Sequence, residues 1–265
     1  MAQATWLTSA PIAHRGLHDA RAGLPENSLS AFERAAACGI PIELDVQRAD
    51  DGLLVVVHDR DVGRVTGEHI PVADLNRGDL RRLRLESSDQ PIPRLSDVLE
   101  LVGGRTPILV DIRHWGVGFD AALAKRVLAD IDGYEGPLAL QSFDPLTVGL
   151  LRLGLRNRNR RDNPWPVGQA SGLLRSARFP ISTIGRSMVS NWLTRPEFIT
   201  FELAALPSRH AERWRHRLNV PLIVFTVESV EDEQRATRLA DNFIFDGYIP
   251  KAYLNKVDQE REVES

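Results

Sequence analysis

The amino-acid sequence predicts an α/β fold, a (β/α)8 or TIM barrel with an extra β-hairpin strand after the second strand. Short apolar runs rich in β-branched residues alternate along the chain with amphipathic, helix-like stretches. About eight such alternations occur over ~250 residues, which is the size expected of this barrel. A doubly wound parallel sheet would show the same alternation, so periodicity alone leaves that architecture open.

The expected strands are the short apolar runs. In chain order they are Pro11–His14, Pro41–Val46, Pro107–Ile112, Leu138–Phe143, Val167–Ala170, Phe198–Leu203, Pro221–Val227 and Phe243–Tyr248. The segments between them carry the start and stop signals of helices.

The clearest helix follows Pro25-Glu26-Asn27-Ser28, where Asn27 or Ser28 can act as the N-cap, and Gly39 ends it. Its apolar side chains share one face, as expected of a helix that packs on a core. Further helices are expected over Ser96–Gly103, Asp120–Ile131, His210–Leu218 and Val230–Ala240.

One run breaks the alternation and predicts the hairpin. Glu43–Val46 is followed by a turn signal, Asp50-Asp51-Gly52, and then by the β-branched run Leu53–Val57. If the turn centres near Asp50-Asp51, antiparallel pairing brings His58 roughly opposite Glu43.

Composition excludes several classes of protein. The 265 residues carry 33 Lys and Arg against 36 Asp and Glu, a formal net charge of −3, and a general nucleic-acid binder would be strongly basic. A single cysteine, Cys38, excludes an internal disulfide framework and a multi-cysteine metal site. No apolar run is long enough to cross a bilayer, and no secretory signal is visible. We therefore expect a soluble cytoplasmic protein of open oligomeric state, with no nucleic-acid partner and no integral membrane segment.

Acidic residues recur at the ends of two expected strands. Glu43 and Asp45 are two apart and so point to one face, and Asp111 and Arg113 repeat the spacing on a later strand. Three carboxylates at one barrel mouth would repel one another unless a cation lay between them. Oxygen ligands of this kind suit Mg²⁺ or Ca²⁺ better than zinc. The alternative is that these acids pair with arginines.

His14 and Arg15 stand at the end of the first strand, before Gly16, where the chain can turn sharply. Histidine can act as a general acid or base, and the planar guanidinium of arginine matches a phosphate. With His58 at the end of the hairpin and the acidic cluster nearby, this combination suits phosphoryl transfer or phosphodiester cleavage.

The sequence resembles the glycerophosphodiester phosphodiesterase family. The motifs that match are His14-Arg15-Gly16, Pro25-Glu26-Asn27-Ser28 with Ala31-Phe32, Glu43-x-Asp45-Val46, Asp51-Gly52, Val57-His58-Asp59, Arg64-x-Thr66-Gly67, Ile92-Pro93-x-Leu95 and Ser142-Phe143. The match is strong over the first third of the chain and weakens after Phe143.

The resemblance implies a barrel enzyme that hydrolyses glycerophosphodiesters to glycerol phosphate and an alcohol. By this analogy, His14 and His58 are the acid–base pair, and Arg15 binds the phosphate. One divalent cation, Mg²⁺ or Ca²⁺, would be held by three carboxylates, which are those of Glu43, Asp45 and Asp111.

The third ligand departs from the family pattern, which is usually Glu-x-Lys where this chain has Asp111-x-Arg113. The shorter aspartate would bind through a bridging water or favour a larger ion such as Ca²⁺. Arg113 keeps the positive charge with a longer reach, and Trp115 lies just beyond it. We expect Arg113 and Trp115 to contact the substrate, Trp115 at the alcohol group.

Two other functions stay open from sequence alone. One is a lyase-like phospholipase that stops at a cyclic phosphate, and the other is a barrel that binds a phosphorylated ligand without turnover. We expect one barrel domain over residues 1–254, a polar tail over residues 255–265, and a basic surface loop over residues 156–161.

Overall fold

A computed structural model describes residues 5–86, 88–115, 120–157, 165–172, 188 and 190–258. The strands are β1 (Ile12–Ala13), β2 (Ile42–Arg48), β3 (Leu54–Val56), β4 (Ile108–Ile112), β5 (Leu138–Ser142), β6 (Val167–Ser171), β7 (Ile199–Glu202), β8 (Leu222–Val227) and β9 (Asn242–Phe245). Each of the eight expected runs overlaps one of these strands, and β3 is the predicted hairpin strand. Most of the predicted basic loop and of the polar tail lies outside the described residues.

The strands form a nine-stranded sheet in the order β1-β9-β8-β7-β6-β5-β4-β2-β3, and β1 also pairs with β2. All strands except β3 therefore belong to a closed ring, and β3 is bonded outside it. The fold is the predicted (β/α)8 barrel with one extra strand. By internal contacts the chain divides into two compact units, Ala13–Leu138 and Met1–Ile12 with Ala139–Ser265.

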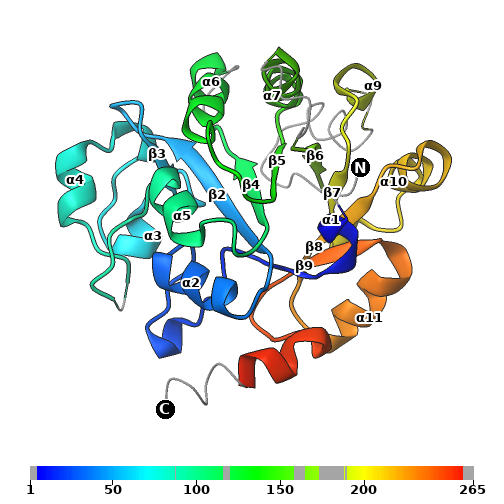
Figure 1. Cartoon of the computed structure of the whole chain (residues 1–265), viewed down its shortest axis with the longest axis horizontal. Helices are drawn as coiled ribbons and strands as arrows, with labels where there is room; N and C mark the ends of the chain where they lie inside the picture. Colours follow the sequence, from blue (N-terminus) through cyan, green and yellow to red (C-terminus); the bar gives the residue numbers. More distant parts are fainter. Residues whose placement is uncertain are drawn as a thin grey trace. The chain divides into compact units, whose positions relative to one another are not determined.

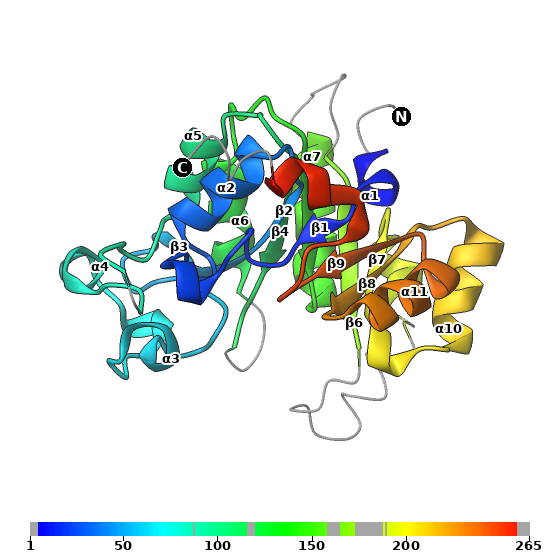
Figure 2. The same ribbon diagram turned by 90° about the horizontal axis from the view of Figure 1, so that it is seen from below.

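The unit Ala13–Leu138 is organised around β2. This strand pairs in parallel with β1 and β4 and antiparallel with β3. Its helices are α2 (Leu29–Ala37), α3 (Gly63–Thr66), α4 (Arg77–Arg82), α5 (Leu95–Val102) and α6 (Ala121–Asp130), with 3₁₀ turns at Ala20–Ala22 and Val72–Asp74. Helices α2 and α5 pack side by side (Figures 1 and 2).

Helix α2 shows how local sequence sets the element. Ser28 is the N-cap, and its hydroxyl oxygen accepts a hydrogen bond from the amide of Ala31 at 3.2 Å. Phe32 and Ala35 are fully buried, as the predicted apolar face requires. Helix α5 begins at Leu95, one residue before the predicted start at Ser96, because the Asp97 carboxylate accepts a hydrogen bond from the amide of Arg94.

The β2–β3 hairpin is confirmed, with a shift in its register. Val46 lies opposite Val56 and Arg48 opposite Leu54, so the turn centres on Asp51. Continuing this register would place His58 opposite Leu44, one residue from the predicted partner Glu43. Strand β3 also ends at Val56, so His58 lies in the loop that follows it.

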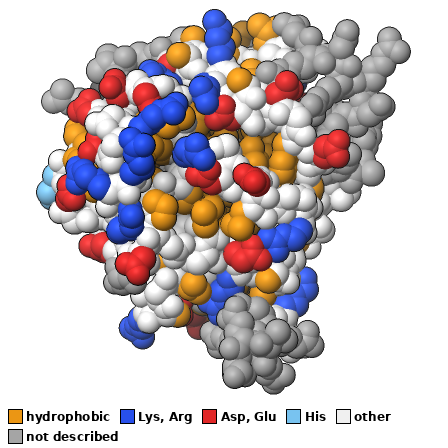
Figure 3. Space-filling view, turned by 60° about the vertical axis from the view of Figure 1, so that its left-hand side comes forward, with side chains coloured by type: hydrophobic (Ala, Val, Ile, Leu, Met, Phe, Trp, Pro, Cys, Tyr) orange, Lys and Arg blue, Asp and Glu red, His pale blue; other side chains and the backbone are white. Residues whose placement is uncertain are grey.

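Residues 49–92, which we call the β3 excursion, have an apolar core of their own. This core contains Ala49, Val55, Val57, Val62, Val65, Val72, Leu75, Leu80, Leu83, Leu85 and Ile92. Basic and acidic side chains are interspersed on the face shown in Figure 3. Ion pairs on the excursion include Arg77–Asp51 and Arg82–Glu68.

The other unit contains β5 to β9 in parallel pairs. Its helices are α1 (Trp6–Ser9), α7 (Pro145–Asn157), α9 (Asn191–Thr194), α10 (Arg209–Glu212) and α11 (Val230–Leu239), with a π-helix at Arg213–Arg217 and 3₁₀ turns at Leu203–Ala205 and Lys251–Tyr253. The Asn242 amide donates to the carbonyl oxygens of Leu7 and Ala10, which ties the N-terminal segment to β9.

The helices differ from expectation in two ways. The stretch predicted as one helix over His210–Leu218 is α10 followed by the π-helix. Helices α1, α3, α4, α7 and α9 were not predicted; in α7, Thr147, Gly149 and Gly154 weaken the helical pattern. Within the described part of the chain, no helix has both the length and the hydrophobicity needed to cross a membrane.

Candidate active site

Three buried carboxylates converge where β2 and β4 run side by side. Asp45 and Asp111 lie in direct register, and Glu43 precedes Asp45 by two residues on the same face of β2. One carboxylate oxygen from each residue lies within 4.8 Å of the other two. All three residues are at most 3% exposed. The predicted acidic cluster is therefore present, and it is built entirely within the unit Ala13–Leu138.

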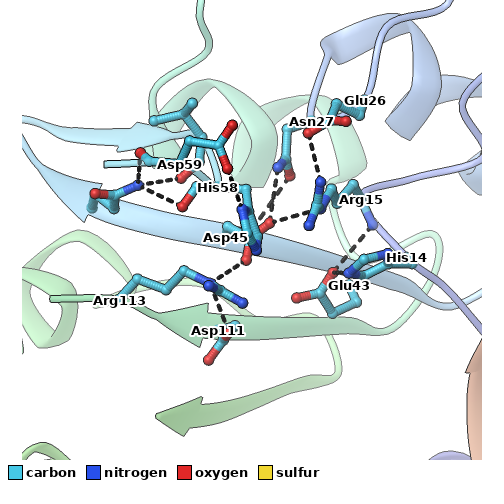
Figure 4. A network of polar contacts seen from close by, with 12 residues as sticks. His14, Arg15, Glu26, Asn27, Glu43, Asp45, His58, Asp59, Asp111 and Arg113 are labelled. Atoms are coloured by element: carbon cyan, nitrogen blue, oxygen red, sulfur yellow. Dashed lines mark hydrogen bonds and ion pairs between the residues drawn. The ribbon is translucent and has the colours of Figure 1, made fainter. Parts of the chain in front are cut away.

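Two arginines lie against these carboxylates (Figure 4). Arg15 Nε lies 3.3 Å from Asp45 Oδ2, and the amide of Arg15 donates to Glu43 Oε2 at 3.1 Å. Arg113 Nε lies 2.5 Å from Asp45 Oδ1 and 3.0 Å from Asp111 Oδ2. The arginine pairing that the sequence left as an alternative thus exists together with the acidic cluster.

The carboxylates differ in their affinity for a proton. Burial, together with the charges of Asp45 and Asp111, raises the pKa of Glu43 well above its usual range. Burial also raises the pKa of Asp111, to about 6, against the opposing charge of Arg113. Burial alone would raise the pKa of Asp45, but the charges of Arg113, His58 and Arg15 hold it well below its usual range. The two arginines therefore do not fully offset the acidic charge.

This cluster fits a divalent cation. Asp111 Oδ1 is buried and accepts no hydrogen bond from the described residues. Asp45 Oδ1 also accepts none, although the Arg113 guanidinium lies beside it. Buried oxygen atoms need a donor or a cation, and carboxylate ligands favour Mg²⁺ or Ca²⁺. The residues that could hold the ion are Glu43, Asp45 and Asp111.

Asn27 orders Asp45 from the side opposite Arg113. Its amide nitrogen donates to Asp45 Oδ2 at 3.0 Å, and its amide oxygen accepts from the backbone amide of Asp45 at 3.4 Å. Arg15 and Asn27 both have left-handed backbone, with φ of 55° and 54°, and the amide of Asn27 donates to the Arg15 carbonyl. The loop after β1 and the loop before α2 are therefore bonded to each other beside the cluster.

The two predicted histidines lie near the cluster, on loops that follow different strands. His14 follows β1, and its Nε2 lies 4.0 Å from Glu43 Oε2. His58 lies in the loop after β3, and its Nδ1 lies 2.7 Å from Asp59 Oδ1. Burial lowers the pKa of His58, against the charge of Asp45. Neutral His58 can accept a proton at the ring nitrogen that Asp59 does not contact.

Trp115 borders this group on the loop after β4. Its ring lies 6.4 Å from the His58 ring in an edge-to-face arrangement, and the Arg113 guanidinium lies 5.8 Å from its centre. The side chain is 40% exposed, so part of an apolar ring is available to a ligand.

Several supporting residues received no role at the site from the sequence. The Gln47 amide nitrogen lies within hydrogen-bonding distance of the carbonyl oxygens of Val57, His58 and Asp59. Glu26 and Arg64 link the loops that carry Arg15 and His58. Glu26, Asn27, Asp59 and Arg64 all lie inside matched motifs, which was the available signal. Gln47 lies outside those motifs.

Two kinds of comparison with known sequences agree. The model of the glycerophosphoryl diester phosphodiesterase family matches residues 14–153, more than half of the chain. The glycerophosphodiester phosphodiesterase of Caldanaerobacter subterraneus subsp. tengcongensis is 40% identical over 143 residues, which cover 50% of this chain and 57% of that protein. Mouse glycerophosphodiester phosphodiesterase 1 is 37% identical over 152 residues, covering 53% and 44%. The chain thus spans about half the length of the curated relatives it matches.

The fold and the site together define a class of protein, the (β/α)8 barrels that carry an acidic cluster beside two histidines. Within this class, the chain belongs to the glycerophosphoryl diester phosphodiesterase family.

Solved structures confirm the fold. A phosphodiesterase from Oleispira antarctica, determined in complex with its product sn-glycerol-3-phosphate, has a TM-score of 0.72 at 17% identity, covering 96% of this chain and 99% of that one. The glycerophosphodiester phosphodiesterase of Thermotoga maritima has a TM-score of 0.64 at 22% identity, covering 96% and 98%.

Proposed function

We propose that this protein hydrolyses small glycerophosphodiesters to glycerol phosphate and an alcohol, with one divalent cation, Mg²⁺ or Ca²⁺, as cofactor. The observation that carries the proposal is the buried carboxylate cluster with His14, His58 and Arg15 around it, in a member of this family. The glycerol phosphate bound to the Oleispira antarctica phosphodiesterase supports the choice of substrate class.

The side chains have complementary roles in this proposal. Arg15 binds the anionic phosphate and is held in place by its contacts with Glu26 and Asp45. One histidine of the pair His14 and His58 takes the proton of the attacking hydroxyl or water, and the other gives a proton to the departing alkoxide. A cation at the carboxylates would supply electrostatic stabilisation to the phosphoryl oxygens. Arg113 and Trp115 would contact the substrate, Trp115 at the alcohol group.

The test is an assay on several glycerophosphodiesters with a chelator and with Mg²⁺ or Ca²⁺ added back. Turnover should disappear on chelation and return with one of the ions. His14→Ala and His58→Ala should each lower kcat at least ~10²-fold. His69→Ala is the control, because His69 is 87% exposed and pairs with Asp61 on the β3 excursion.

Phosphorus NMR of the products separates the other functions. Prompt appearance of glycerol phosphate supports hydrolysis. A lasting cyclic phosphate would contradict hydrolysis and support the lyase-like reaction. Binding of every diester without turnover would contradict an enzymatic role. The single domain over residues 1–254 and the cytoplasmic location stay predictions of the sequence.

A further inference from the structure

A line of alternating charges runs through the site along one edge of the carboxylate cluster. His58 Nδ1 contacts Asp59 Oδ1 at 2.7 Å, and Asp59 Oδ2 contacts Arg64 Nε at 2.5 Å. Arg64 then binds Glu26 through both terminal nitrogens, at 2.8 and 2.7 Å. Glu26 Oε1 accepts a further hydrogen bond from Arg15 Nη1 at 2.8 Å. We call these five residues the charge chain. Figure 4 labels four of them, His58, Asp59, Glu26 and Arg15.

We infer that Arg64 is a positioning residue that couples His58 to Arg15 through the two carboxylates of the charge chain. The inference rests on the proposed function, because it takes His58 as an acid–base group and Arg15 as the phosphate ligand. Arg64 itself touches neither of them, so it acts through Asp59 and Glu26.

At one end, the chain sets the state of the His58 ring. Asp59 is a hydrogen-bond acceptor at Nδ1, so the neutral ring carries its proton there and leaves Nε2 free to exchange a proton with substrate. Asp59 could rotate away if it had no second partner. Arg64 holds its other oxygen, and Gln47 holds the backbone of the same loop.

At the other end, the chain sets the direction of the Arg15 guanidinium. Glu26 contacts Nη1, and Asp45 lies beside Nε, so the guanidinium is held from two sides. The Glu26 carboxylate is in turn held by two nitrogens of Arg64, which is the geometry that fixes a carboxylate most firmly. A change at Arg64 therefore leaves Glu26 with Arg15 and Asp59 with His58 as their remaining partners in the charge chain, and loosens both carboxylates together.

The surroundings favour a coupled network over isolated surface pairs. Burial alone would raise the pKa of Glu26, but its bonds to Arg64 and Arg15 lower it. Burial likewise opposes the lowered pKa of Asp59, which results from hydrogen bonds to His58 and Arg64. A single exposed ion pair contributes little to stability, whereas a network of bidentate pairs holds a defined geometry.

The experiment is a mutant cycle on the full chain with a glycerophosphodiester substrate. Asp59→Asn should lower kcat roughly 10- to 100-fold, because misplacing an acid–base group by about 1 Å has effects of that size. Glu26→Gln should act mainly by raising KM, through Arg15. These two residues do not touch. The change in kcat/KM of the double variant should differ at least ~3-fold from the product of the two single changes. This difference should vanish when the same substitutions are made in Arg64→Met.

Two further variants bracket the result. Arg64→Lys keeps one cationic contact and should recover part of the activity lost in Arg64→Met. Arg82→Met is the matched control, because Arg82 is 49% exposed against 50% for Arg64 and pairs with two carboxylates, Glu68 and Asp79, elsewhere on the excursion. It should leave kcat and KM unchanged.

A spectroscopic readout tests the histidine end without turnover. The ¹⁵N spectrum of histidine-labelled protein, with the His58 signals assigned by their loss in His58→Gln, should show His58 protonated at Nδ1. Asp59→Asn and Arg64→Met should both shift that tautomer balance, and Arg82→Met should not.

The coupling would be overturned if, in the protein that keeps Arg64, the effect of Glu26→Gln with Asp59→Asn on activity equalled the product of the two single effects. An unchanged His58 spectrum in Arg64→Met would overturn it as well. A wild-type protein that hydrolyses no glycerophosphodiester would instead overturn the proposed function and the catalytic meaning of the chain with it.

Discussion

Gln47 places one amide nitrogen near three successive carbonyl oxygens, those of Val57, His58 and Asp59. An amide nitrogen has two hydrogen atoms, so at least one of these bonds is shared. The same device recurs at Gln169 on β6, whose amide nitrogen contacts the carbonyl oxygens of Ser142, Phe143 and Ala170. At Gln47 the buried side chain satisfies carbonyl oxygens of the loop after β3, and at Gln169 it joins the end of β5 to β6.

Gln47→Met should destabilise the protein and lower kcat. The side chain is 4% exposed, and methionine has a similar size but no donor, so buried carbonyl oxygens lose their partner. We expect the free energy of unfolding to fall by about 1–3 kcal/mol in urea denaturation. Gln47→Glu should be worse, because a carboxylate would face the carbonyl oxygens. Wild-type stability in both variants would contradict this role.

Asp111 should make the cation-free protein less stable as the pH rises. Its pKa is raised from 3.8 to about 6 in the folded state, first by burial. The folded protein therefore keeps a proton that the unfolded chain releases, so the stability contributed by Asp111 is present below about pH 4 and lost as the pH rises through about 6.

Asp111→Asn removes this titration and should be the more stable protein above about pH 6.5 when a chelator is present. The difference should reach about 1–3 kcal/mol, measured by urea unfolding at several pH values. The substitution also removes the Asp111 charge that raises the pKa of Glu43, and this second effect favours the variant at the same high pH values. A difference that stays constant between about pH 4 and 7 would contradict the assignment.

Among the elements, the connection from β1 to α2 does most to position the site. It carries His14, Arg15 and Gly16 at one end and Asn27 at the other. The sequence predicted a sharp turn at Gly16, and the structure shows a φ of 84° there. The amide of Leu17 donates to the Ala31 carbonyl, so the turn brings the chain directly onto α2.

Gly16→Ala and Gly67→Ala form a matched pair that separates crowding from backbone strain. Both glycines have positive φ, 84° and 77°. A Cβ at Gly16 would lie 3.0 Å from Ala31 Cβ and from Phe32 Cδ1, whereas nothing lies within 4 Å of one at Gly67. We expect a loss of about 1 kcal/mol for Gly67→Ala and a further 1–3 kcal/mol for Gly16→Ala in denaturant unfolding. Equal losses in the free energy of unfolding would contradict the crowding at Gly16 and show that α2 shifts to make room for the added methyl group.

At the scale of the whole molecule, the fold could be predicted because its signals are local. Each expected strand is a short apolar run, and their number and alternation favour a barrel, whereas the pairing of β1 with β2 that closes the ring is seen only in the structure. Two carboxylates two residues apart also predicted a shared face. The charge chain could not be predicted this way, since Glu26 and Arg64 are far apart in sequence and their pairing depends on how two loops meet. The register of the hairpin likewise depended on one turn residue.

Cation binding should stabilise the entire chain. An ion that binds only the folded state adds about 2.7 kcal/mol at a concentration 100 times its Kd. We expect Mg²⁺ or Ca²⁺ to raise Tm by several degrees over the chelated protein, and Glu43→Gln to abolish the shift. Thermal unfolding followed by circular dichroism measures both. An equal shift in Glu43→Gln would place the ion elsewhere.

Strand β3 is bonded outside the ring, and the β3 excursion packs around its own apolar core. His14 thus follows β1, a strand of the ring, whereas His58 lies on the β3 excursion. Substitutions inside the excursion can shift His58, one member of the proposed acid–base pair, without altering any strand of the ring. Sequence changes confined to the β3 excursion can therefore alter rate and specificity within this family while the strands of the barrel stay the same.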